Sequence, residues 1–260
     1  MDRGLRARRP AQAVPLMLLA QAPDGLPQIT SGTDLAAVMT PLLARLTWPD
    51  GSEGVGEDDV VVIASKVVAK AEGRLVAAAD REAAIDAESV REVARRAYPD
   101  GSVLRIVETH HGLVMAAAGI DASNVPPGTI LLLPKDPDAS ARTIRRGLYA
   151  RLGVRPAVLV TDTVGRPWRR GIAEIVIGAA GMHPLADLRG DLDSHGRELQ
   201  SSVVALADEI AAAADLVKGK TGGRPVAVVR GSGARVHAAD GPGAVAALRT
   251  SDEDMFRTGG

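Results

Sequence analysis

The sequence predicts an α+β fold, because short β-like apolar runs and longer runs with helical spacing follow one another without a strict βαβ rhythm. A chain of 260 residues buries roughly 70% of the surface that its unfolded form exposes, which suffices for one large domain or two closely packed ones. The sequence contains no cysteine, so disulfides, thiol catalysis and Cys-ligated metal sites are excluded.

Runs of Val and Ile predict the strands, and apolar residues three or four positions apart predict the helices. The predicted strands are residues 60–64, 102–108, 113–117, 129–133, 157–161, 174–177 and 225–229. The predicted helices are residues 34–46, 86–97, 140–152 and 199–217. Asp138 or Ser140 is the expected N-cap of the third helix, and Gly219 is expected to end the fourth.

The N-terminus has some features of a signal peptide, since basic residues precede the apolar stretch 13–20 and Ala20-Gln21-Ala22 follows. The apolar stretch is short, however, and Pro15 interrupts it. We therefore favour a short first strand behind a variable basic tail, residues 1–24, and a cytoplasmic location. A cleaved signal peptide is the alternative.

The composition argues against two kinds of partner. The 31 Lys and Arg residues balance 32 Asp and Glu residues, and only 2% of the chain is aromatic, so neither a polycationic surface nor a base-stacking platform is expected. No apolar run approaches the ~18 residues of a membrane span. We expect no nucleic-acid partner and no membrane partner.

Lysine usage gives the first indication of chemistry. Most basic residues are arginine, whereas four of the few lysines form two close pairs, Lys66 with Lys70 and Lys218 with Lys220. Lysine is a compact charge suited to phosphate oxygens, and the Gly-rich turn around Lys220 offers backbone N–H groups as well. The turn is not a Walker A loop, because Ala214 stands where the first glycine is required. Solvated lysines and a glycine helix cap are the alternative interpretation.

Two aspartates are candidate metal ligands. Asp121 follows an apolar strand, and Asp162 closes the predicted strand 157–161 with Thr163 beside it. Such hard oxygen donors suit Mg²⁺ or Mn²⁺, although each aspartate could instead cap a turn. Together with the lysine pairs they predict a metal–nucleotide site.

The segment from Gly165 to Gly171 is a candidate substrate loop. Arg166 and Arg169 can form bidentate contacts with carboxylate or phosphate, and Trp168 offers a flat face to a ring. An anionic aromatic substrate fits this composition. The alternative is a surface loop with a half-buried tryptophan.

Several of these motifs, in this order from about Gly25 to about Val229, resemble the coenzyme F420:L-glutamate ligase family. The residues that carry the resemblance are Ser65-Lys66-x-x-x-Lys70-Ala71-Glu72-Gly73, His111-Gly112, Ala118-Gly119-Ile120-Asp121-x-Ser123-Asn124, Asp162-Thr163-x-Gly165-Arg166-Pro167-Trp168-Arg169 and Asp191-x-Asp193-x-x-Gly196-Arg197-x-Leu199.

The resemblance implies a GTP-dependent amide ligase that adds L-glutamate to the deazaflavin precursor of coenzyme F420. It implies a fold peculiar to the family, with two packed subdomains in an intertwined homodimer. The catalytic unit would span residues 25–245, and residues 246–260 would form a tail or linker. The ending of this chain, residues 252–257, resembles the junction that precedes a flavin-dependent reductase domain in related fused chains.

The resemblance also implies ligand contacts. The residues expected to contact GTP are Leu26, Pro27, Gln28, Ile29, Ser65, Lys66, Lys70, Asn124, Lys218, Gly219, Lys220, Thr221, Gly222 and Gly223. Asp121, Asp162 and Thr163 are expected to hold two divalent ions, Mg²⁺ or Mn²⁺, and K⁺ is a further candidate cation. Asp121, Asp162 and Arg169 are the expected catalytic residues.

Two other classes of protein share these features. A nucleotide-binding regulatory module would bind GTP without chemistry, and a metal-dependent phosphotransferase would leave the phosphate on a stable product. Glutamate-dependent release of GDP and phosphate distinguishes the ligase from both.

Overall fold

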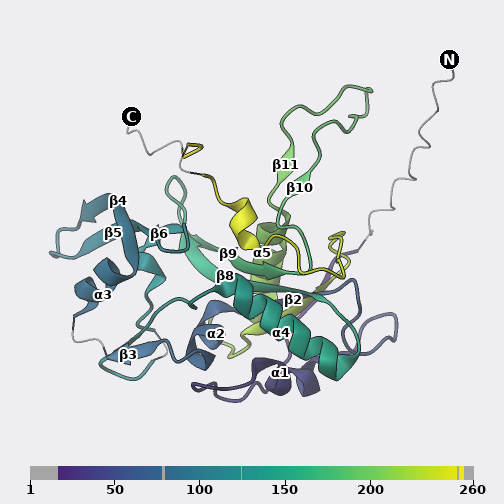
Figure 1. The fold of residues 1–260 in the computed structure, drawn as a ribbon, viewed down its shortest axis with the longest axis horizontal. Helices are drawn as coiled ribbons and strands as arrows, with labels where there is room; N and C mark the ends of the chain where they lie inside the picture. The colour runs from purple at the N-terminus through teal and green to yellow at the C-terminus, as the bar shows by residue number, and fades with distance from the viewer. Residues whose placement is uncertain (1–16, 78–79, 124, 251, 255–260) are drawn as a thin grey trace.

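A five-stranded sheet forms the centre of the computed structural model, which describes residues 17–77, 80–123, 125–250 and 252–254 (Figure 1). Its strand order is β1-β12-β2-β8-β9. The bounds are Leu19–Gln21 for β1, Val226–Arg230 for β12, Val60–Ala64 for β2, Ala157–Gly165 for β8 and Ile172–Ala180 for β9. Only β2 and β8 pair in parallel; the other pairs are antiparallel.

Helices cover both faces of this sheet, so alternate residues of the central strands enter two different cores. Val61 and Ile63 of β2 pack with α1 (Leu35–Leu43), α2 (Ser65–Ala71) and α4 (Pro137–Leu152). Val60 and Val62 pack on the other side with α5 (Leu206–Lys218) and the 3₁₀ turn η2 (Ala244–Ala247). Burial on both faces explains why β2 is a continuous run of Val and Ile.

A smaller lobe lies at the left of Figure 1, around a separate core that includes Ile85 and Val107. It contains a three-stranded sheet, the helix α3 and the pair β3–β7. The bounds are Leu75–Ala77 for β3, Arg81–Ala87 for α3, Ser89–Ala97 for β4, Val103–Thr109 for β5, Val114–Ala116 for β6 and Thr129–Leu131 for β7. The 3₁₀ turn η1 (Ala117–Gly119) follows β6.

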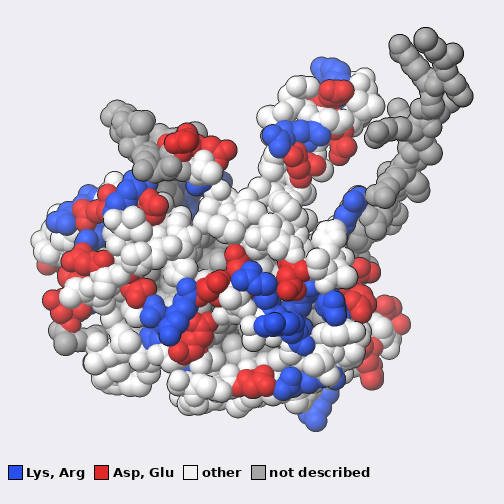
Figure 2. All heavy atoms as spheres, in the orientation of Figure 1, with Lys and Arg blue, Asp and Glu red and all other residues white. Residues whose placement is uncertain are grey.

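A hairpin arm connects the main sheet to α5 and projects from the body (Figure 1). Its base is the two-stranded pair of β10 (Ala186–Asp187) with β11 (Val203–Val204). On the face drawn in Figure 2, side chains of both charge signs lie side by side over the arm and the body.

The expected mixed α+β class is confirmed, but the helix predicted over residues 86–97 is wrong. Residues 89–97 form β4, which pairs with β5. Arg91 contacts Glu108, and Glu92 contacts Arg105, so ion pairs across the two strands favour the sheet over a helix. The periodicity of the apolar residues fits a helix here, but tertiary pairing overrides it.

Two helix boundaries also differ from prediction. The helix expected over residues 199–217 begins only at Leu206, because the preceding residues return along the arm as β11. The N-cap of α4 is Asp136, whose side chain accepts a hydrogen bond from the Ala139 amide, rather than Asp138 or Ser140. Gly219 ends α5 with a positive φ, as expected.

The strand expected over residues 157–161 continues to Gly165, where a loop turns into β9. Asp162 therefore lies within β8 rather than at its end. The neighbouring strand β2 stops at Ala64, opposite Thr161. From Asp162 onward, β8 therefore no longer pairs with β2.

Residues from both ends of the chain belong to the folded body. Residues 19–21, inside the segment expected to be a variable tail, form β1. Near the other end, Leu248 packs against the core and Asp254 forms an ion pair with Arg91. No helix within the described residues is long and apolar enough to cross a membrane.

The outer edge of β9 is protected by hydrogen bonds from loops and helix ends. Asp208 accepts the amide of Val176, and Asp138 accepts the amide of Ala179. The amide of Gly181 donates to the carbonyl of Asp240. These acceptors take the place of a neighbouring strand.

We predict that Gly178→Ala destabilises the fold. An added Cβ at this buried position of β9 would lie 2.3 Å from the carbonyl oxygen of Pro137, so the backbone of α4 must move. Overpacking of this kind costs about 1–3 kcal/mol. Chemical denaturation measures the change, and Gly165→Ala on β8 is the control because no atom lies within 4 Å of its added Cβ. Equal stability of both variants would contradict the prediction.

Candidate functional site

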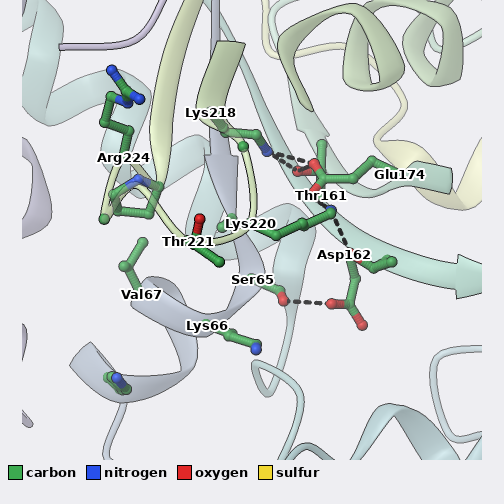
Figure 3. Close-up of a pocket in the computed structure, with 16 residues that line it drawn as sticks. Ser65, Lys66, Val67, Thr161, Asp162, Glu174, Lys218, Lys220, Thr221 and Arg224 are labelled. Atoms are coloured by element: carbon green, nitrogen blue, oxygen red, sulfur yellow. Dashed lines mark hydrogen bonds and ion pairs between the residues drawn. The ribbon is translucent and has the colours of Figure 1, made fainter. Parts of the chain in front are cut away.

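A cavity of about 550 Å³ opens where β2 ends (Figure 3). Three parts of the chain build it: the β2–α2 junction, the middle of β8 with its partner on β9, and the loop between α5 and β12. The lining residues are Ala64, Ser65, Lys66, Val67, Lys70, Thr161, Asp162, Thr163, Glu174, Lys218, Gly219, Lys220, Thr221, Gly223, Arg224 and Pro225. Many of the residues predicted from the sequence are therefore neighbours in space.

Asp162 faces the cavity from β8 and accepts a 2.9 Å hydrogen bond from the hydroxyl of Ser65. Burial raises the pKa of its carboxyl to about 6, despite the hydrogen bonds from Ser65 and the Thr163 amide. Repulsion from Glu174 and Asp121 contributes to the same rise. A bound cation would relieve both effects.

Asp121 lies at the junction between the small lobe and the main body. Lys66 of α2 contacts its carboxylate at 2.5 Å, and the Ser123 amide donates to its other oxygen. Burial opposes ionisation of Asp121, but the contacts with Lys66 and Ser123 hold its pKa below the usual value. Asp121 and Asp162 also line an adjoining cavity of about 160 Å³.

The carboxylate of Glu174 on β9 accepts hydrogen bonds from three side chains on the α5 side of the sheet. The hydroxyl of Thr161 donates to Glu174 at 2.6 Å, and the Lys218 ammonium donates to the same carboxylate oxygen. The Lys220 ammonium lies 3.3 Å from the second oxygen. Burial raises the pKa of Glu174, but these positive charges outweigh burial and hold it below its usual value.

The donor set fits a hard divalent cation. Asp121, Asp162 and Thr163 offer carboxylate and hydroxyl oxygens, the ligands that Mg²⁺ prefers. The negative charges of Glu174 and Asp121 also act on Asp162, and a cation there would offset this repulsion. Among the described residues, no group of three or more His, Cys, Asp or Glu side chains is placed to hold a metal ion. Mg²⁺ sites at phosphates commonly use only one or two carboxylates together with substrate phosphates.

The predicted nucleotide segment 26–29 does not line the cavity, but residues on either side of it contact Arg224 and the end of α2. It begins next to Asp24, whose carboxylate lies 3.8 Å from the Arg224 guanidinium. It ends near Gly32, whose amide donates to the carbonyl of Ala71 at the end of α2. Ile29 is buried in the core and Leu26 packs against it, whereas Pro27 and Gln28 are exposed.

The remaining predicted residues have mixed placements. Gly222 does not line the cavity, although its neighbours do. Asn124 lies outside the described residues. Arg169 and Trp168 occupy the tip of the β8–β9 hairpin, where 76% of the Trp168 side chain is exposed. Trp168 is thus neither half-buried nor part of the core.

Sequence reasoning missed Glu174, Thr161 and Arg224 as cavity residues. Glu174 was expected only as the first residue of an apolar strand. A carboxylate inside a Val- and Ile-rich strand requires a buried partner, and this requirement was the available signal. Nothing in the local pattern distinguishes Arg224 from the other arginines of the chain.

Lysines, a glycine-rich loop and carboxylates around one cavity are typical of enzymes that act on phosphate groups. The chain belongs to the F420-0:gamma-glutamyl ligase family, whose sequence pattern matches residues 25–231. It is therefore an acid–amino-acid ligase.

Curated relatives agree over most of the chain. The coenzyme F420:L-glutamate ligase of Methanopyrus kandleri is 40% identical over 77% of this chain and 86% of its own length. The ligase of the same name from Methanothermobacter thermautotrophicus is 36% identical over 90% of this chain and 96% of its own length. That of Haloarcula marismortui is 37% identical over 91% and 94%, respectively.

We predict that Asp162→Asn stabilises the metal-free protein at pH 8. Because the folded pKa of about 6 lies above the ordinary 3.8, folding favours the protonated carboxyl below pH 3.8 and loses that advantage as the pH rises through 6. A neutral amide avoids the cost, so we expect a gain of roughly 1–3 kcal/mol at pH 8 and none at pH 3.5.

Thermal unfolding between pH 3.5 and 8 tests this prediction. Asp121→Asn is the matched control: the pKa of Asp121 is lowered, so removing its charge should destabilise the protein at pH 8. A less stable Asp162→Asn protein at pH 8 would show that the carboxylate is not under electrostatic strain.

Proposed function

We propose that the protein is a GTP-dependent coenzyme F420:L-glutamate ligase that forms an amide bond through an acyl phosphate. The observation that carries this proposal is the single cavity that brings Lys66, Lys220 and the glycine-rich loop together with Asp162. The family membership and the names of the relatives support the choice of substrates.

The chemistry requires activation of a carboxylate, which is a poor acyl donor. The γ-phosphoryl group of GTP passes to the terminal carboxylate of the deazaflavin acceptor, and GDP leaves. The amine of L-glutamate then attacks the acyl carbon, loses a proton, and expels phosphate. The protein contributes positioning and charge neutralisation, which are the main catalytic factors in phosphoryl transfer.

The cavity residues divide this work. Lys66 and Lys220 balance the phosphate charges, and the amides of Gly219 to Gly223 can approach the phosphate oxygens closely. Asp121, Asp162 and Thr163 would hold Mg²⁺ or Mn²⁺, which supplies further charge neutralisation at the phosphates. Lys70, the segment 26–29 and Asn124 are proposed to complete the nucleotide site, and K⁺ remains a candidate cation.

The acceptor is proposed to lie beyond the phosphates, toward the tip of the β8–β9 hairpin. This hairpin carries Asp162 and Thr163 in the cavity and ends in the exposed residues Arg166, Trp168 and Arg169. Two guanidinium groups and an indole match an acceptor with anionic groups and a ring. We also propose a cytoplasmic homodimer.

Loss of the metal ligands should abolish the reaction. We expect Asp121→Asn and Asp162→Asn each to lower turnover at least 100-fold, which corresponds to roughly 3 kcal/mol of barrier. The assay follows GDP and phosphate release, which must require both the deazaflavin acceptor and L-glutamate, and identifies the glutamylated product by mass spectrometry.

The same assay separates the alternatives. GTP binding without glutamate-dependent GDP release would indicate a regulatory module. A stable phosphorylated product would indicate a phosphotransferase. Normal turnover of both asparagine variants at saturating Mg²⁺ would refute the metal assignment.

The hairpin tip should affect the acceptor rather than the nucleotide. We expect Trp168→Ala and Arg169→Ala to weaken acceptor binding roughly tenfold, the effect of one lost charge-assisted hydrogen bond or ring contact, and to leave the dissociation constant of GTP nearly unchanged. Calorimetry with each ligand measures the two affinities. Equal losses for both ligands would assign the loop a structural role and place the acceptor elsewhere.

A further inference from the structure

The two lysines of the α5–β12 loop have different surroundings, although only Gly219 separates them. The side chain of Lys218, at the end of α5, is 2% exposed, whereas that of Lys220 is 46% exposed. From their spacing in the sequence, both lysines would be expected to bind phosphate in the same way. Their contacts show that they are not equivalent.

Both lysines line the cavity, but the ammonium of Lys218 is held by buried protein groups. This ammonium donates to the carboxylate of Glu174 and lies 3.1 Å from the hydroxyl of Thr161. Thr161 itself donates to the same carboxylate oxygen, so the three side chains form a closed group below the loop (Figure 3). A buried ammonium is tolerated only when such partners compensate its lost hydration.

A register shift between β8 and β9 brings these side chains together. The pairing of β8 with β9 shifts register after Val160, so that Thr161 lies opposite Val176 and Thr163 lies opposite Glu174. Thr161, Thr163 and Glu174 consequently share contacts with the two lysines on the α5 side.

Lys220 is shared rather than enclosed. Its ammonium contacts Asp215 at 2.7 Å, Thr163 at 3.1 Å and Glu174 at 3.3 Å, and its side chain lines the cavity. An exposed ammonium with two longer contacts, to Thr163 and Glu174, can exchange one of them for a phosphate oxygen at little cost.

We propose that Glu174 and Lys218 form a buried structural pair that supports the loop, and that Lys220 is the loop lysine that binds the phosphates. This assignment rests on the proposed nucleotide site, but it gives the two lysines separate roles. Lys218 stabilises the loop through Glu174 and makes no phosphate contact.

Four variants test the assignment by thermal unfolding and by calorimetry with GTP: Glu174→Gln, Lys218→Met, the double variant Glu174→Gln/Lys218→Met, and Lys220→Met. Each single change in the buried pair should lower the Tm by roughly 5–15 °C, because it leaves one buried charge without its partner. The double variant removes both charges, and its Tm should recover most of the loss.

GTP affinity distinguishes a support role from direct phosphate binding, because only the loss of a phosphate ligand weakens it strongly. We expect the double variant to bind GTP within about threefold of the unmodified protein. Lys220→Met should keep its Tm within about 3 °C and weaken GTP binding roughly tenfold or more. A double variant with recovered Tm that binds GTP as weakly as Lys220→Met would overturn the proposal, because Lys218 would then be a phosphate ligand.

Two further outcomes separate this proposal from the proposed function. Failure of the double variant to recover its Tm would overturn the support role of the buried pair itself. If the unmodified protein bound no GTP, the proposed function would fail, while recovery of the Tm would still uphold Glu174 and Lys218 as a coupled pair.

Discussion

The candidate site depends on the unequal lengths of neighbouring strands. β2 ends at Ala64, whereas its neighbour β8 continues to Gly165 together with β9. If β2 were longer, its next residues would pair with β8 at Asp162 and occupy the space of the cavity. Because it turns into α2 instead, Ser65 and Lys66 stand beside a carboxylate that the rest of the sheet holds rigidly.

This geometry concentrates charge next to a hydrophobic core. Val60 to Ile63 are fully buried immediately before the site, and the site itself contains both carboxylates and ammonium groups. Glu174 is fully compensated by its neighbours, Asp121 is compensated by Lys66, and Asp162 is not. The uncompensated group is where a ligand would gain the most electrostatic energy.

The contact between Lys66 and Asp121 also joins two separately packed units. Lys66 lies on a helix of the main body, and Asp121 follows η1 in the small lobe. In η1, Ala117 and Ala118 both have positive φ values, of 50° and 55°, which few residues other than glycine adopt. The backbone is therefore held in an unfavourable conformation three residues before Asp121, and strained backbone of this kind often lies near functional sites.

Sequence reasoning located β2, Asp162 and the lysine pairs because these signals are local. β2 is a Val-rich run, Asp162 directly follows the apolar run 157–161, and lysine is rare elsewhere in the chain. It failed where pairing across the chain decides the structure. Residues 89–97 have helical spacing but pair with β5, and the buried partner of Glu174, Lys218, lies far along the chain. The different surroundings of Lys218 and Lys220 likewise follow from the end of α5 rather than from their spacing.

The carboxylates along β9 have a consequence for solubility. A sheet edge with free amides is a template for strand addition and hence for aggregation. Here Asp138 and Asp208 accept such amides, and burial raises the pKa of Asp208, so acid removes the charge of the group that accepts the Val176 amide. Acidification would thus favour edge-to-edge association of intact molecules, even where the two cores on either side of the sheet remain folded.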